Sequence, residues 1–170
     1  MVPEGGNLLD EFRARLEELH GSLHEAASLG AARAVASELI GAATVARWDE
    51  DVLDGVVGRE QEAPAVAAEV SLILADVGVA ATGAFGFVHR AGRPRATGLL
   101  PPRQIVLLDA NDLVADMAGA LVHVGLRLGA EPLPGNVVFA AGPSRTSDIE
   151  QRSILGVHAP RDVTVVIFRP

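Results

Sequence analysis

The sequence predicts a single domain of the α/β class, built around a central sheet, and three observations support this. Helical and strand-like patterns alternate along the chain, which is typical of α/β domains. Apolar residues make up 49% of the 170 positions, and a chain of this length buries roughly 70% of its unfolded surface. No internal repeat, low-complexity tract or long linker interrupts the pattern. We therefore expect residues 1–170 to form one domain.

The first predicted element is a helix over residues 7–20. Asn7 is a good N-cap and Gly21 a good helix end. One face of this helix carries an apolar stripe formed by Leu8, Leu9, Phe12, Leu16 and Leu19. A short strand is expected over 22–25.

A second helix is predicted from Ser28, which caps it, to Gly41, which ends it. Its inward-facing residues would be Leu29, Ala32, Ala36, Leu39 and Ile40. We expect a strand over 43–46 and a short helix or turn over 49–57.

A run of small residues then predicts a hairpin. Its strands lie near 76–80 and 84–88, and Gly83 supplies the turn conformation that other residues resist. The next residues, HRAGRPRATG at 89–98, are expected to form a loop.

The pattern continues with a buried strand over 104–108. A long helix is expected to start at Asn111 or Asp112 and to end at Gly129. A second buried strand follows over 137–141.

The last elements are a short helix over 147–155 and a strand over 163–168. The 21 residues from 142 to 162 are enough for a helical crossover between parallel strands. This would place the helix after the carboxyl end of the strand at 137–141.

The turn between that strand and that helix is a candidate anion site. Ser147 and Glu150 fit a capping box, and the first turn of a helix offers unpaired N–H groups to an anion. Hydroxyls and a guanidinium would add donors; they belong to Ser144, Arg145, Thr146 and Ser147. The alternative is an ordinary capped turn. His158, in the following loop, is either a hydrogen-bond donor or acid–base group, or a structural histidine.

Charge is distributed unevenly along the chain. The net charge is −8, yet residues 77–108 contain no acidic side chain. The arginines of this window are Arg90, Arg93, Arg95 and Arg103. The window is either a solvated loop or an anion site, because guanidinium groups suit carboxylates and phosphates. The acidic balance of the whole chain argues against a nucleic-acid partner.

Several classes of chemistry are disfavoured by composition. Cysteine is absent, which excludes disulfides, thiol nucleophiles and cysteine-held iron–sulfur clusters in this chain. His20 and His24 are four residues apart, but Gly21 breaks the helix between them, and no known metal- or nucleotide-binding motif is present. We therefore predict no metal site and no cofactor in this chain. No apolar run reaches the ~18 residues of a membrane helix, and the first residues do not resemble a signal peptide. We expect a cytoplasmic protein with no membrane contact.

The run GPSRTSDIEQRSILGVHAP, residues 142–160, resembles the closing signature of the lactate-utilization protein C family, the LUD domain. Residues 76–84 and the segment 99–102, LLPP, resemble its central hairpin and the strand entry that follows. The resemblance implies a three-layer α/β/α fold with a mostly parallel central sheet, similar to sugar-phosphate isomerases and CoA transferases. It also implies action with iron–sulfur partner proteins in the oxidation of L-lactate to pyruvate. The clusters would belong to those partners.

The candidate ligand-binding residues combine both lines of reasoning: Ser144, Arg145, Thr146, Ser147, Thr82, Gly83, Arg90 and His158. Three positions depart from the family pattern. Ala81 stands where the hairpin usually has an acid, Gln104 where histidine is frequent, and Ala159 where glycine is usual. Since Ala81 cannot act as nucleophile or base, the sequence favours binding over catalysis. Two alternatives stay open: an enzyme acting on a sugar phosphate or acyl-CoA, and a non-catalytic regulatory or interaction protein.

Overall fold

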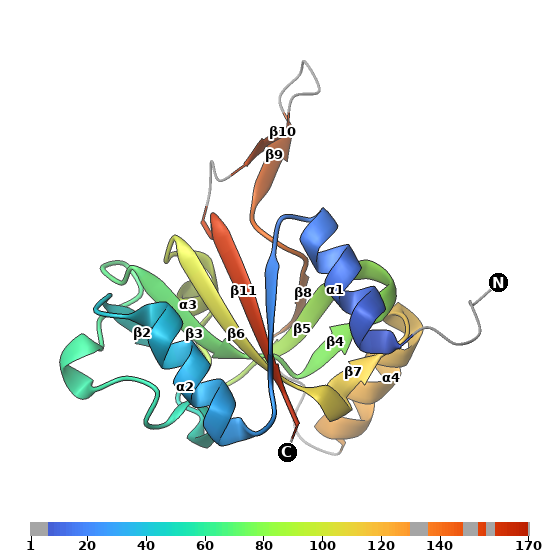
Figure 1. The fold of residues 1–170 in the computed structure, drawn as a ribbon, viewed down its shortest axis with the longest axis horizontal. Coiled ribbons are helices and arrows are strands. Elements are labelled where there is room, and N and C mark those ends of the chain that lie inside the picture. The colour runs from blue at the N-terminus through green and yellow to red at the C-terminus, as the bar shows by residue number, and fades with distance from the viewer. Residues whose placement is uncertain (1–6, 130–135, 148–152, 156–158, 170) are drawn as a thin grey trace.

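A computed structural model describes residues 7–129, 136–147, 153–155 and 159–169 of the chain. At its centre lies a five-stranded sheet in which every neighbouring pair of strands is parallel (Figure 1). Its strands, in spatial order, are β1 (Ser22–Ala26), β11 (Asp162–Phe168), β6 (Arg103–Asp109), β3 (Val70–Leu74) and β2 (Val45–Arg47). The predicted α/β fold with a parallel central sheet is therefore confirmed.

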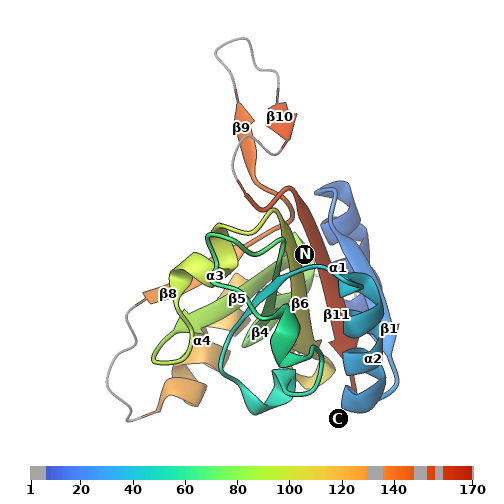
Figure 2. The ribbon, with the colours of Figure 1, turned by 90° about the vertical axis from the view of Figure 1, so that its left-hand side faces the viewer.

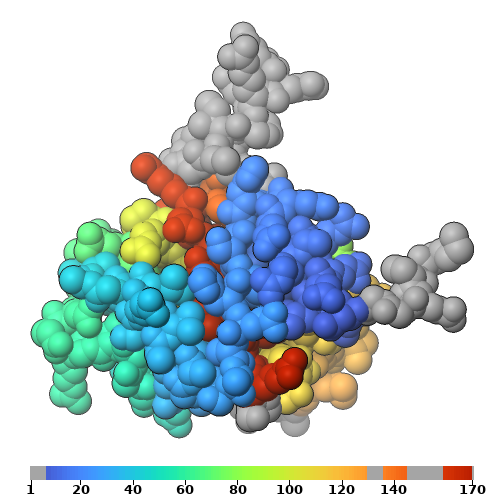
Figure 3. Space-filling view, viewed as in Figure 1, coloured from blue at the N-terminus to red at the C-terminus, as the bar shows by residue number. Residues whose placement is uncertain are grey.

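Helix α2 (Leu29–Ile40) covers one face of this sheet, over β1 and β11, and helix α1 (Leu8–Glu18) lies beside the edge strand β1, against residues 80–82 (Figures 1 and 2). In the space-filling view their residues, in blue, occupy most of the face seen in Figure 1 (Figure 3). Both begin at the predicted caps: Asn7 Oδ1 accepts a hydrogen bond from the N–H of Leu9, and Ser28 Oγ from that of Ala31, each at 3.2 Å. These caps satisfy N–H groups that would otherwise lack partners.

A second, four-stranded sheet packs against the other face. Its neighbours are antiparallel except for the short parallel pair of β4 and β7. Its strands, in spatial order, are β7 (Leu113–Val114), β4 (Val77–Val79), β5 (Ala84–His89) and β8 (Asn136–Ala140). One side of β5 places Phe85 and Phe87 in the main core, and the other side packs Val88 under helix α4 (Met117–Leu128).

Shorter elements connect these layers. Helix α3 (Arg95–Leu99) packs beside β3, on the face opposite α2 (Figure 2). The 3₁₀ turns are η1 (Asp51–Leu53), η2 (Arg59–Gln61), η3 (Ala80–Thr82) and η4 (Ala110–Asp112). Within the described residues, no helix combines the length and apolar character that a membrane span requires.

The hairpin predicted at 76–88 is present as β4, η3 and β5. Its turn glycine, Gly83, has φ +63°, and a Cβ there would lie 2.5 Å from the backbone nitrogen of Leu16 in α1. The absence of a side chain therefore serves both the turn and the close packing of helix α1 on it.

Two predictions about the C-terminal half are wrong. In the segment predicted as a helix over 147–155, the described residues are strand: Ser147 ends β9 (Arg145–Ser147), and residues 153–155 form the antiparallel β10 (Ser153–Leu155), while 148–152 lie outside the described residues. The expected crossover between parallel strands is also absent, because β8 pairs with β5 in the second sheet. The chain therefore passes from the second sheet to the amino end of β11 by way of these two strands (Figure 1).

The long helix begins later than predicted. Residues Asn111 and Asp112 lie in η4, and α4 starts at Met117 after Asp116, whose Oδ1 accepts a hydrogen bond from the N–H of Gly119 at 2.8 Å. Its predicted end at Gly129 is confirmed.

Candidate functional site

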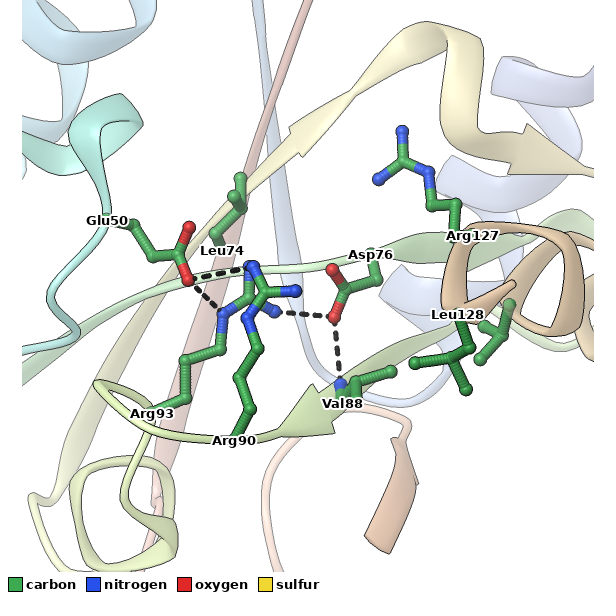
Figure 4. Close-up of a pocket in the computed structure, with 9 residues that line it drawn as sticks. Glu50, Leu74, Asp76, Val88, Arg90, Arg93, Arg127 and Leu128 are labelled. Atoms are coloured by element: carbon green, nitrogen blue, oxygen red, sulfur yellow. Dashed lines mark hydrogen bonds and ion pairs between the residues drawn. The ribbon is translucent and has the colours of Figure 1, made fainter. Parts of the chain in front are cut away.

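A cavity of about 250 Å³ lies where β2 and β3 end, beside the last turn of α4 (Figure 4). Ligands of open α/β sheets bind at the carboxyl ends of strands, so its position is typical of a binding site. Three guanidinium groups, two carboxylates and four aliphatic side chains line it: Glu50, Leu74, Asp76, Val88, Arg90, Arg93, Val124, Arg127 and Leu128.

Arg93 is the structural centre of this cavity. Its side chain is 1% exposed; Nη1 donates to Asp76 Oδ2 at 2.6 Å, and Nε donates to Glu50 Oε1 (Figure 4). Its guanidinium carbon also lies 5.2 Å from the centre of the Trp48 ring, within cation–π distance. Burial alone would lower the pKa of Arg93, but the two carboxylates raise it above its ordinary value. The guanidinium is therefore charged.

The backbone around Arg93 is held by a dense set of hydrogen bonds. Its N–H donates to the carbonyl of Arg90 at 3.0 Å, and its own carbonyl lies 3.0 Å from His89 Nδ1. Trp48 Nε1 donates to the carbonyl of Pro94 at 3.1 Å. This turn directly follows β5, so the second sheet sets the position of both cavity arginines that it carries.

Asp76 forms the connection between β3 and β4. Its N–H donates to the carbonyl of Gly86 at 2.8 Å, and its Oδ2 accepts a hydrogen bond from the N–H of Val88, also at 2.8 Å. The same Oδ2 accepts from Arg93. Its other oxygen, Oδ1, makes no hydrogen bond to the described residues and points away from Arg93 in Figure 4. An acceptor is therefore available on the side of Asp76 that faces away from Arg93.

Glu50 bridges the two arginines of the turn. Oε1 accepts from Arg93 and from Arg90 Nη2, the latter at 3.1 Å. Partial burial would raise the pKa of Glu50, but hydrogen bonds and charge from Arg93 and Arg90 lower it overall. Arg90, with a side chain 51% exposed, keeps further N–H donors for a ligand.

Arg127 borders the cavity from the last turn of α4. Its Nη2 donates to Asp112 Oδ1 at 2.5 Å, while the side chain remains 48% exposed. His123 Nε2 is buried and lies 3.2 Å from the same oxygen, without the alignment of a hydrogen bond. Burial raises the pKa of Asp112, and the charge of Asp109 adds to this, although Arg127 and His123 act in the opposite direction.

The arrangement suits the binding of an anion. Arg93 forms ion pairs with Glu50 and Asp76, which hold its guanidinium in a fixed position in the cavity wall. Arg90 and Arg127 are half-exposed on the cavity lining, and guanidinium groups of this kind bind carboxylates through charge-assisted hydrogen bonds. Among the described residues, no three His, Asp or Glu side chains are grouped closely enough to hold a metal ion.

Of the predicted ligand-binding residues whose side chains the structure describes, only Arg90 lines this cavity. Thr82 and Gly83 lie at the other end of β5, where Thr82 Oγ1 accepts the N–H of Ala84 at 3.3 Å. Ser144 lies at that same end, since Phe85 pairs with Ala140; its N–H donates to the carbonyl of Pro160 at 2.8 Å.

The remaining predicted residues belong to the segment between β8 and β11. Arg145, Thr146 and Ser147 form β9, so the predicted helix N-terminus does not exist there. His158 lies outside the described residues. Among the predicted residues whose side chains are described, Thr82, Gly83 and Ser144 thus lie at one end of β5 and Arg90 at the other.

The arginine-rich window does not form one patch. Arg93 is buried, Arg95 is exposed at the start of α3, and Arg103 Nη2 donates to the carbonyl of Leu39 at 2.8 Å. Glu50, Asp76 and Arg127 are not among the site residues predicted from the sequence. Asp76 could have been predicted as a site residue, because it immediately follows an apolar run that ends at the sheet edge.

Comparison with known proteins agrees with this fold. The LUD domain model matches residues 41–168. Lactate utilization protein C of Oceanobacillus iheyensis is 30% identical over 121 residues, which are 70% of this chain and 52% of that protein. The protein of the same name from Shouchella clausii is 31% identical over 100 residues, 59% of this chain and 44% of that protein. The chain thus spans about half the length of these curated relatives.

One solved structure has the same fold. It is a DUF162 family protein from Deinococcus radiodurans, with a TM-score of 0.68 and 19% identity, covering 95% of this chain and 96% of that one. Because the family model matches three quarters of the sequence, this chain belongs to the LUD domain family.

Proposed function

We propose that this chain is a LUD-domain subunit that supports the oxidation of L-lactate to pyruvate together with iron–sulfur partner proteins. The support is its similarity to proteins named lactate utilization protein C. The absence of cysteine is consistent with clusters that belong to the partners, and the proposal assigns no cofactor to this chain. It places the chain in the cytoplasm.

Within this function, the chain binds an anionic ligand in the cavity bordered by Arg90 and Arg127. The observation that carries this is that two half-exposed guanidinium groups, those of Arg90 and Arg127, line the same cavity as the buried Arg93. A charge-assisted hydrogen bond contributes about 1.5–3 kcal/mol. Two such contacts give a dissociation constant on the order of millimolar, so binding is expected to be weak without a partner.

Calorimetry with L-lactate, pyruvate and inorganic phosphate tests the site. Arg90→Ala and Arg127→Ala are each expected to weaken binding by about 10- to 150-fold. Arg95→Ala is the matched control, because Arg95 is exposed and does not line the cavity. Binding that survives both cavity substitutions but is lost in Arg145→Ala would move the anion site to β9.

Co-expression with candidate iron–sulfur partner proteins tests the partner role. Affinity purification is expected to recover at least one of them with the wild-type chain. Recovery of none, under conditions in which the partner is soluble and carries its clusters, would contradict the subunit role.

A further inference from the structure

The ligand class can be narrowed, on the basis of the proposed anion site, from the charge and size of the cavity. We infer that the site holds a monocarboxylate whose aliphatic chain is longer than that of lactate. Three features of the lining carry this inference: the net charge, the volume and the aliphatic wall.

The charge of the lining disfavours a dianion. Three arginines and two carboxylates line the cavity, which is a sum of +1, and Asp112 pairs with Arg127 and brings the local balance to zero. A dianion such as phosphate or a dicarboxylate would bring its second charge toward Asp76 or Glu50, and like charges at short distance repel. A single carboxylate at Arg90 or at Arg127 avoids this repulsion.

The volume exceeds what lactate needs. About 250 Å³ corresponds to the space of roughly eight water molecules in the liquid. Lactate has fewer non-hydrogen atoms than the number of water molecules that would fill this volume, and it has only one methyl group. With its carboxylate at the arginines, it would leave the rest of the cavity to water.

The remaining wall is aliphatic. Val88 and Val124 are 3% and 4% exposed, and Leu74 and Leu128 are half-buried at the cavity. Leu128 belongs to α4 and Leu74 ends β3 (Figure 4). A ligand chain in the cavity would therefore contact one side chain that packs on the main core and one that packs on the smaller cluster under α4. Apolar contacts of this kind reward each added methylene group.

The test is a series of straight-chain monocarboxylates from acetate to hexanoate, with isocaproate, L-lactate, succinate and phosphate, titrated into the whole chain by NMR or calorimetry. Affinity is expected to rise about fourfold per methylene group until the cavity is filled. Succinate and phosphate are expected to bind more weakly than butyrate. Leu128→Phe should remove the preference for longer chains, whereas Leu126→Phe should keep it, since Leu126 is 78% exposed on the same helix and does not line the cavity.

The outcomes separate this inference from the proposed function. Equal affinity for acetate, lactate and hexanoate, abolished by Arg127→Ala, overturns the aliphatic ligand but leaves the anion site intact. Stronger binding of succinate or phosphate than of butyrate also overturns it. If no anion binds to the wild-type chain, the proposed anion site itself is wrong. Should Leu128→Phe fail to fold, the wild-type series alone decides.

Discussion

Replacing Arg93 with methionine is expected to destabilise the protein strongly, because it leaves two carboxylates without their buried counter-charge. Asp76 would keep only the N–H of Val88, and Glu50 only Arg90. The side chains of Asp76 and Glu50 are 9% and 17% exposed, so water compensates little. Removing one partner from a buried ion pair costs about 3–5 kcal/mol, a large part of the roughly 5–15 kcal/mol that stabilises a typical domain.

Two further variants test whether the loss of stability in Arg93→Met comes from the unpaired carboxylates. Arg90→Met removes a half-exposed ion pair to the same Glu50 and is expected to cost only about 0–1 kcal/mol. Adding Asp76→Asn to Arg93→Met removes the unpaired charge but keeps an acceptor for Val88, which should restore about 1–3 kcal/mol.

Urea denaturation followed by far-ultraviolet circular dichroism measures all three at neutral pH, with m-values compared to check the two-state assumption. The reasoning fails if Arg93→Met costs no more than Arg90→Met. It also fails if Asp76→Asn destabilises the Arg93→Met background further.

Three other predictions concern stability. Gly83→Ala should cost more than Gly55→Ala in the free energy of unfolding, because both glycines have positive φ but only the first would place its methyl 2.5 Å from helix α1; urea titration measures the difference. Ser28→Ala removes the cap of α2 and should cost about 1 kcal/mol by the same assay. Glu50 has a folded-state pKa below its ordinary value of 4.5, so its stabilising contribution is complete above that pH and is lost as pH falls through the folded-state pKa. The stability difference between wild type and Glu50→Gln should therefore shrink on acidification from about pH 6 to pH 3.

Each of these has a clear negative result. Equal losses for the two glycine variants would mean that the turn and α1 separate at little cost. A cap substitution without effect would mean that the N–H groups at the start of α2 are satisfied by water. If the free energies of unfolding of wild type and Glu50→Gln change in parallel with pH, Arg90 and Arg93 do not stabilise the charged form of Glu50 in the folded state.

The helices were predictable where short-range chemistry decides. The caps Asn7 and Ser28 and the end at Gly41 depend on residues within one turn of each other, and the structure has all three. The hairpin around Gly83 was equally local. Strand β3, which positions Asp76, was not predicted, because a short apolar run has no periodicity that separates a strand from a helix.

The errors came from partners that are distant in the sequence. Ser147 and Glu150 have capping-box spacing, but the pairing of β9 with β10 determines the conformation of Ser147. The window around Arg93 has no acidic residue, yet Glu50 and Asp76 reach it from 43 and 17 positions away. Charge balance along a sequence is thus a poor guide to charge balance in space. Arg127 was missed for the same reason, since only the packing of α4 brings it to the cavity.

The contact between Trp48 and Arg93 gives the protein a built-in optical reporter. Trp48 is its single tryptophan and tyrosine is absent, so the indole emission originates at one place in the molecule. The ring is fully buried, with Phe87 and His89 at its edges and the guanidinium of Arg93 over it. Indole fluorescence is therefore expected to respond to any change at Arg93, and titration with a candidate ligand tests whether occupancy of the cavity reaches Trp48.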